Sequence, residues 1–219
     1  MKILYLKRED VEEWLLKKHY AHRMPCITDA FGLYLNKELV GVCTYGIPAS
    51  PNLCIGVCGD KWKDKVRELN RLVIDDKTTL ENKNIGSAFV SATLRRMRHC
   101  GGIIVVSYAD TGMNHIGYIY QACNFYYTGA TKERTDICTE DGKHSRHYDK
   151  NQDYNSNRKK RTSKHRYVYF CAGYRKQKKE MLAALKYPIL PYPKGESKRY
   201  DASYKPVTQQ ILFDMIGEQ

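Results

Sequence analysis

The sequence predicts a mixed α/β fold of the α+β kind, in which helices flank a mixed central sheet. Short apolar segments of strand length alternate with amphipathic segments of helical length along most of the chain. The 219 residues suffice for one domain with a sizeable core, or for a core with an appendage. Of the net charge of +13, +11 lies in residues 143–179, which overlap a late polar segment without periodicity and indicate a basic insertion.

The first part of the chain is expected to form a strand, a helix and a hairpin. The strand covers residues 1–6, and the helix has Asp10 as its N-cap and is stopped by Pro25. Two strands follow at 30–35 and 39–45, and the short polar turn between them makes a hairpin.

The middle of the chain carries the clearest patterns. Residues 66–74 alternate as a strand does, and 75–83 are polar and loop-like. Residues 84–99 place apolar side chains on or near one face of a helix. Residues 103–108 form the central apolar strand, and 115–124 the next helix.

The last part combines strands with a helix and an extended tail. A strand starts at residue 125, another covers 165–171, and 177–185 are helical. Three prolines then keep the chain extended, and 207–216 have the pattern of a short amphipathic helix.

The chain divides into a core of residues 1–132 and 165–194, a basic insertion at 133–164 and a tail at 195–219. Residues 143–179 contain 13 Lys and Arg but only two Asp, so this segment carries a net charge of +11. Such a block favours a polyanion partner, and the alternative is a solvated loop. Interleaved Tyr, His and Asn favour nucleic acid, because these groups can contact bases while the cations hold phosphates. The residues expected to bind it are Arg158, Lys159, Lys160, Arg161, Lys164 and Arg166.

Composition also limits the compartment and the class of site. The eight cysteines contain no CxxC pair, so neither a disulfide framework nor a zinc site is favoured. No apolar run reaches the roughly 18 residues that span a membrane, and the N-terminus becomes charged too early for a secretory signal. We expect a soluble cytoplasmic protein with no membrane partner.

The order of elements is similar to that of the GCN5-related N-acetyltransferases, in which a helix N-terminus holds the pyrophosphate of coenzyme A. The matching residues here are Asn84, Gly86 and Ser87, which makes them the candidate cofactor site. A single glycine stands where that family has a cluster. This argues against conventional use of acetyl-coenzyme A, although a related two-carbon donor remains open.

Several segments resemble the bacteriophage Mom proteins. They are His19-Tyr20, Arg67 to Val73, Ser107 to Asp110, His115 to Gly117, Ile119 to Ala122, Asn124-Phe125, Tyr127 to Gly129 and Pro191 to Lys194. The resemblance implies a phage- or prophage-encoded enzyme, acting in the host cytoplasm on double-stranded DNA. It implies addition of a carbamoylmethyl group to N6 of adenine, which protects the DNA from restriction.

That product limits the reaction, because the carbon joined to N6 is a methylene and not a carbonyl. Plain acyl transfer would give an amide. Either N6 attacks an activated two-carbon donor, or a glycine-like amine replaces the exocyclic amine at C6. Two other functions stay open: a non-catalytic nucleic-acid-binding protein on a degenerate acyltransferase fold, and an acyltransferase acting on another amine.

Asp110 and Tyr120 are the first candidate catalytic residues. Asp110 ends the central strand, where it could accept a proton from the adenine amine, or merely cap the following turn. Tyr120 matches a general acid of related acyltransferases by resemblance, whereas its helical spacing favours a place in the core.

Four further residues complete the set: His19, Tyr20, Arg71 and Ser107. His19 and His22 are three residues apart, so on one helix they would face the same side, as a metal pair or as base and orienter. The alternative is a pair of surface histidines near a helix end, and iron stays an open metal.

Arg71 would share a strand face with Leu69 and could clamp an anion, or form a surface ion pair. Alternation places either Ser107 or Tyr108 in the site. A homodimer is left open.

Overall fold

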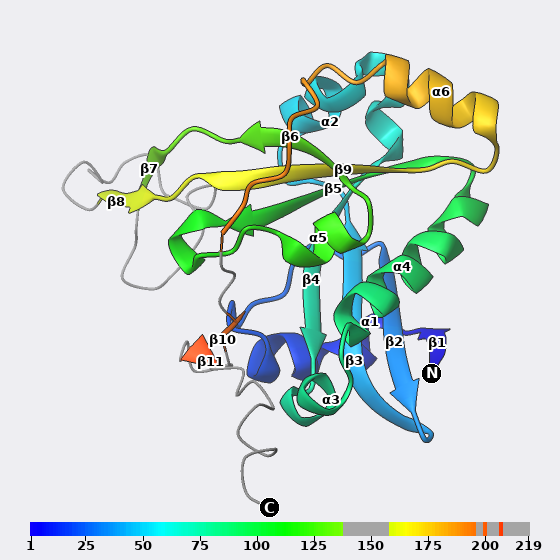
Figure 1. The fold of residues 1–219 in the computed structure, drawn as a ribbon, viewed down its shortest axis with the longest axis vertical. Coiled ribbons are helices and arrows are strands. Elements are labelled where there is room, and N and C mark those ends of the chain that lie inside the picture. Colours follow the sequence, from blue (N-terminus) through cyan, green and yellow to red (C-terminus); the bar gives the residue numbers. More distant parts are fainter. Residues whose placement is uncertain (138–157, 196–198, 201–205, 208–219) are drawn as a thin grey trace, which may run out of the picture.

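A seven-stranded sheet forms the centre of the protein, as the computed structural model shows for residues 1–137, 158–195, 199–200 and 206–207 (Figure 1). The strand order is β1-β2-β3-β4-β5-β9-β6. The strands are β1 (Lys2–Tyr5), β2 (Asp29–Leu35), β3 (Glu38–Gly46), β4 (Val66–Ile74), β5 (Ile103–Asp110), β6 (Tyr126–Ala130) and β9 (Lys164–Cys171). Helices flank this sheet, so the predicted mixed α/β fold is confirmed.

The first four strands form an antiparallel unit whose turns follow from local sequence. Asn36 and Lys37 join β2 to β3 with φ of 47° and 72°. Two consecutive positive φ angles make the kind of two-residue turn whose twist suits a hairpin. The predicted hairpin is therefore confirmed to within two residues at each strand end.

The sheet divides between β4 and β5. These strands are parallel, and they pair over only three positions, from Val66↔Ile104 to Glu68↔Val106. Beyond that point β4 stays with β3 as far as Ile74, whereas β5 pairs with β9 as far as Asp110↔Lys164. The two halves of the sheet consequently run apart (Figure 1).

Helices cover both faces of the sheet. The helices α4 (Ile85–Met97) and α5 (Tyr118–Ala122) pack on one face, in a core that includes Phe31, Phe89 and Val105. On the opposite face, α1 (Arg8–Glu13) and the π-helical turn Trp14–Lys18 cover the β1–β4 half. The helices α2 (Pro51–Cys58) and α6 (Arg175–Ala183) cover the other half, against residues such as Ile104 and Val168.

Two predictions in the N-terminal half are wrong. Residues 75–83 are not a loop, because α3 (Asp76–Glu81) forms once the Asp75 carboxylate accepts the Thr78 N–H at 3.2 Å. The first helix begins earlier than expected, and it also ends earlier, because the π-helical turn that continues it stops at Lys18 and not at Pro25. Asp10 lies in its first turn and accepts the Lys7 N–H at 3.0 Å, instead of being the N-cap.

The predicted insertion is bounded by a small hairpin. β7 (Arg134–Ile137) and β8 (Arg158–Arg161) pair antiparallel in a two-stranded sheet of their own. Residues 138–157 between them lie outside the described part of the chain. The core resumes at Lys164, one residue before the predicted strand, and the short strands β10 (Arg199–Tyr200) and β11 (Pro206–Val207) pair in the tail.

Two expectations concern the end of the chain and the membrane. Apart from Val207, the helix expected at 207–216 lies outside the described residues. Among the residues that are described, no helix is both long and apolar enough to cross a bilayer.

Replacing Phe89 with Ala should destabilise the protein by about 3–5 kcal/mol, because Phe89 is fully buried between α4 and the sheet. Urea unfolding followed by circular dichroism measures this change in the free energy of unfolding. Leu80→Ala is the matched control, since Leu80 is 54% exposed. Equal losses for the two variants would contradict the packing described for α4.

Candidate active site

Ser107 stands where β5 leaves β4. Its hydroxyl donates a hydrogen bond to the Leu69 carbonyl at 3.2 Å, which joins the two strands one residue past their last backbone pair. Ser107 is fully buried, whereas Tyr108 is half-buried and packs on the opposite face. Of the two alternating residues, Ser107 faces the side of the sheet that carries Tyr120.

The ring of Tyr120 packs in the core, and its hydroxyl lies near the point where β4 and β5 separate. The ring lies 5.4 Å from Phe125 and 5.4 Å from Tyr167, centroid to centroid. The hydroxyl lies close enough to the Ser107 side chain for that side chain to affect its pKa. Burial raises the pKa of Tyr120, and the interaction with Ser107 opposes that rise only in part. The phenol therefore stays protonated and can donate a hydrogen bond, so the core and catalytic interpretations are compatible.

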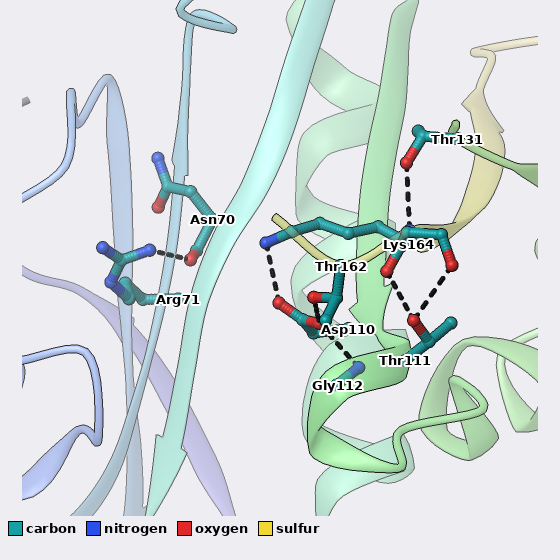
Figure 2. Close-up of polar contacts among 9 residues, drawn as sticks. Asn70, Arg71, Asp110, Thr111, Gly112, Thr131, Thr162 and Lys164 are labelled. Atoms are coloured by element: carbon teal, nitrogen blue, oxygen red, sulfur yellow. Dashed lines mark hydrogen bonds and ion pairs between the residues drawn. The ribbon is translucent and has the colours of Figure 1, made fainter. Parts of the chain in front are cut away.

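Asp110 is a carboxylate whose oxygens are already occupied (Figure 2). One oxygen accepts the Gly112 N–H at 2.9 Å and the Thr162 hydroxyl at 2.5 Å, and the other forms an ion pair with Lys164 at 3.1 Å. Burial raises the pKa of Asp110, but the hydrogen bonds and the Lys164 charge outweigh it and lower the pKa overall. This environment suits an anchor that caps the turn Thr111–Met113. A proton-accepting role for Asp110 stays a prediction.

A β-bulge sets the direction of Arg71. Thr44 pairs with Arg71 and Tyr45 with Leu69, so Asn70 is the extra residue in β4. The predicted strand faces are therefore wrong: Arg71 and Leu69 lie on opposite faces. The Asn70 side chain holds the bulge in place, because it accepts the Thr44 hydroxyl at 2.6 Å and donates to the Cys26 carbonyl at 2.8 Å.

The Arg71 side chain is only partly paired. Its guanidinium donates to the Asn70 carbonyl at 2.6 Å and to the Arg23 carbonyl at 3.5 Å. Its Nε is buried and has no hydrogen-bond partner among the described residues. A buried N–H without a partner costs on the order of 1–3 kcal/mol, so this atom is suited to an acceptor on a ligand.

His19 and Tyr20 reach this region from the end of the first helix. The π-helical turn ends at Lys18, so His19 and His22 do not share a helix face, and that prediction is wrong. His19 Nδ1 accepts the Ala21 N–H at 3.0 Å, and burial together with the Arg71 charge lowers its pKa to about 3. The imidazole is therefore neutral. Its ring stacks on Tyr20 at 4.4 Å.

Metal-binding residues are not gathered here. Within the described part of the chain, no three His, Cys, Asp or Glu side chains are placed to hold a metal ion together. His22 is exposed, and its Nδ1 lies 2.8 Å from the Leu16 carbonyl, whereas His19 is buried. These residues therefore provide no ligand set for iron, the metal that the sequence left open.

Glu68 is a site residue that the sequence analysis did not select. It is the last β4 residue paired with β5, and burial raises the pKa of its carboxyl, while the charges of Arg71, Lys164 and Arg161 oppose that rise. The only signal in the sequence was a lone carboxylate within an alternating strand. That signal equally fits a surface position, because alternation alone does not show that both faces are covered.

The α4 N-terminus is suited to a phosphate-sized anion. Asn84 takes a left-handed conformation ahead of the helix, and the amides of Gly86 and Ser87 have no hydrogen-bond partner among the described residues. A Cβ on Gly86 would meet the Ile119 side chain at 3.2 Å. This glycine therefore serves the packing of α5 on α4.

The six predicted nucleic-acid-binding residues fall into two groups. Arg158 to Arg161 form β8, on which Arg158 and Lys160 are exposed, and Lys160 pairs with Glu133 at 2.7 Å. Lys164 and Arg166 lie in β9 and are engaged within the fold. Arg166 donates to Thr128 at 2.9 Å and stacks on the Tyr187 ring at 3.4 Å.

The family model of the Mom protein family matches residues 1–194, which include every candidate catalytic residue. The chain belongs to the Mom protein family. A 135-residue stretch is also 28% identical to the methylcarbamoylase Mom of Escherichia phage Mu. That alignment covers 57% of this chain and 54% of the phage Mu protein, so it spans about half the length of this relative.

The Mom-family chain also has a likeness to solved acetyltransferase structures. A putative acetyltransferase of Salmonella typhimurium with acetyl-CoA is 10% identical, with a TM-score of 0.48, over 80% of this chain and 96% of that one. An N-acetyltransferase of Staphylococcus aureus Mu50 is 15% identical, with a TM-score of 0.47, over 78% and 98%.

Replacing Asp110 with Asn should destabilise the protein by about 1–2 kcal/mol at neutral pH, because the ion pair with Lys164 is lost. Since folding lowers the pKa of Asp110, this difference should be present above the ordinary Asp pKa and vanish as pH falls through the lowered value. Thermal unfolding from neutral to acidic pH measures it. Asp60→Asn, in the more exposed pair with Lys63, is the control. A difference that persists unchanged at acidic pH would contradict the ion pair.

Proposed function

We propose that this protein transfers a carbamoylmethyl group to N6 of adenine in double-stranded DNA, as a phage modification that protects against restriction. The observation that carries the proposal is the buried, unpartnered Arg71 Nε, which stands at the strand divergence with Tyr120, Tyr20 and a neutral His19. Membership of the Mom family and the likeness to the methylcarbamoylase Mom of phage Mu support the reaction class.

An adenine must leave the duplex stack to reach these groups. Ser107 is fully buried and Tyr120 is half-buried against the core, so a base edge that stays inside a duplex is poorly placed to reach them. Enzymes that modify a base commonly turn it out of the helix into a pocket with aromatic walls. The stacked His19 and Tyr20 rings supply such a wall, and Tyr120 supplies a hydrogen-bond donor.

The donor is held apart from the base in this proposal. The free amides of Gly86 and Ser87 at the α4 N-terminus would hold a phosphate of an acyl-coenzyme A-like donor. When bound, such a donor supplies the two-carbon unit. Because the product carries a methylene on N6, the transfer is an alkylation at that carbon, or an exchange of the amine at C6.

The β7–β8 hairpin is proposed to hold the DNA backbone. Four consecutive basic residues, Arg158 to Arg161, follow one strand, and Arg161 is close enough to Glu68 to influence its charge. The hairpin therefore starts at the site and extends away from it (Figure 1). Phosphate contacts along it would position the duplex without reading its sequence.

Co-expression in a bacterial host should yield DNA that contains carbamoylmethyl-adenine, measured by digestion to nucleosides and mass spectrometry. Tyr120→Phe should lower the modified fraction by about 100-fold or more, since it keeps the ring and removes the proton donor. Tyr118→Phe is the matched control, because Tyr118 lies on the same helix and is 60% exposed. Unmodified adenine with a folded wild-type protein that still binds DNA would favour the non-catalytic alternative.

Replacing Arg158 and Lys160 with Gln should weaken DNA binding for all sequences alike. The slope of log affinity against log salt concentration should fall by about 0.9 for each phosphate contact removed. Fluorescence anisotropy with a labelled duplex at several salt concentrations measures both effects. Arg175→Gln with Lys178→Gln, on exposed α6, controls for total charge. An equal effect of the control pair would show that charge alone, and not the hairpin, holds the DNA.

A further inference from the structure

The helix that carries Tyr120 is too short to fix the place of its own side chains. α5 has five residues, and its N-cap, Gly117, has no side chain that could cap it. Helices shorter than about 12 residues are marginal unless tertiary contacts stabilise them. The position of the Tyr120 hydroxyl therefore depends on the groups that hold α5 from outside.

Gln121, the next residue, holds α5 through its side-chain amide. Its Nε2 donates to the Ile116 carbonyl at 3.0 Å, to the Tyr167 hydroxyl at 3.0 Å and to the Pro193 carbonyl at 3.3 Å. Two of these partners are carbonyl oxygens, which only accept, so the end of the amide that faces them must be the donor. One side chain thus joins the turn before α5, the strand β9 and the tail of the chain.

Tyr167 gives this network a rigid base. It is fully buried in β9, where it pairs with Ser107 on one side and with Tyr127 on the other. Its hydroxyl donates to the Ile116 carbonyl, and burial raises its pKa to about 12, so the phenol stays protonated at neutral pH. A Cβ on Gly117 would overlap the Tyr167 ring, so only glycine lets the turn lie this close to β9.

The tail segment 187–195 closes the network from the edge of the sheet. The Leu190 N–H donates to the Tyr127 carbonyl at 2.9 Å on the edge strand β6. The Tyr192 hydroxyl donates to the Phe125 carbonyl at 2.7 Å, just beyond α5. Prolines in this segment have fixed φ angles, so ordering it costs less entropy than ordering an ordinary loop.

The tail therefore holds α5 at two places. Gln121 joins the helix itself to Pro193. At the turn that follows, the Phe125 N–H donates to the Tyr120 carbonyl at 3.0 Å, while Tyr192 holds the Phe125 carbonyl. A change at either attachment should be felt at Tyr120, because both lie within a few residues of it along the chain.

We propose that Gln121 is a positioning residue of the transfer: by tying α5 to β9 and to the tail, it sets where the Tyr120 hydroxyl lies. This assignment rests on the proposed function, in which Tyr120 is the proton donor. It also gives a role to Gln121 and to the segment Pro191 to Lys194, for which the sequence analysis offered none. A displacement of about 1 Å at a reacting group can cost about 100-fold in rate, so the link affects the reaction as well as the fold.

Gln121→Glu in the full-length protein tests the assignment, because it keeps the shape of the side chain and turns the donor into a charged acceptor facing two carbonyl oxygens. In co-expressing cells, it should lower the fraction of modified adenine by about 10-fold or more. Gln177→Glu is the matched control and should modify DNA as wild type does. Gln177 also bonds backbone groups, those of Gly173 and Gly101, but it lies on α6, on the opposite face of the sheet from α5.

Fluorine NMR provides a readout that needs no donor of the transferred group. A fluorinated tyrosine incorporated only at position 120 reports the surroundings of that side chain. Its resonance should shift in Gln121→Glu and stay in place in Gln177→Glu. A glutamine with a purely structural role would lower the unfolding temperature without moving this resonance.

Tyr192→Phe is a second and milder test. It keeps the ring and removes the hydrogen bond to Phe125, and Tyr192 is 41% exposed, so the variant should fold. It should shift the Tyr120 resonance and lower modification by a smaller factor than Gln121→Glu. Tyr174→Phe, at a side chain that is 63% exposed, is its control.

The outcomes separate the assignment from the proposed function. An unmoved Tyr120 resonance in folded Gln121→Glu overturns the assignment, and so does a wild-type level of modification by that variant. If Gln121→Glu does not fold, the same two results for Tyr192→Phe overturn it. Unmodified adenine in the wild type, with the resonance shifting as expected, would instead overturn the proposed function. The structural link between Gln121 and Tyr120 would then stand without the transfer.

Discussion

The three-position pairing of β4 with β5 is the constraint on which the rest of the structure depends. Parallel strands that separate after Glu68 and Val106 leave backbone groups that need other partners. On their outer edges, β5 stays paired with β9 and β4 with β3. The Ser107 hydroxyl meets the Leu69 carbonyl at the point of separation. The sheet therefore opens between β4 and β5, while the β3–β4 and β5–β9 ladders stay intact.

Polar groups at this opening differ in how far the fold satisfies them. Asp110 is held by three donors, and its lowered pKa follows from them. Arg71 Nε and the Glu68 side chain have no such partners among the described residues, although Arg71 Nε is buried and Glu68 is half-buried. Leaving buried polar groups unpaired lowers stability, and proteins retain such groups mainly where a ligand completes them. Asp110 therefore supports the structure, whereas Arg71 Nε and the Glu68 carboxylate remain able to contact a ligand.

Regular elements could be predicted from sequence because their signals are local. The strand Val66–Ile74 has the predicted ends, and α4 differs from its prediction by one or two residues. The failures arose where a side chain or a distant strand overrides the local pattern. Asp75 turns a polar stretch into α3, and pairing with β3 creates the bulge at Asn70 that moves Arg71 to the other face.

The sequence by itself determined the chemistry that is present: the Mom-family motifs, the phenol of Tyr120, the guanidinium of Arg71 and the basic run at Arg158 to Arg161. Only the tertiary structure decided which groups are engaged and which are free, because partners such as Asp110 and Lys164 meet through pairing of β5 with β9. A local sequence pattern cannot show that two residues so far apart along the chain will meet. A carboxylate's role depends on what surrounds it, and folding alone sets those surroundings.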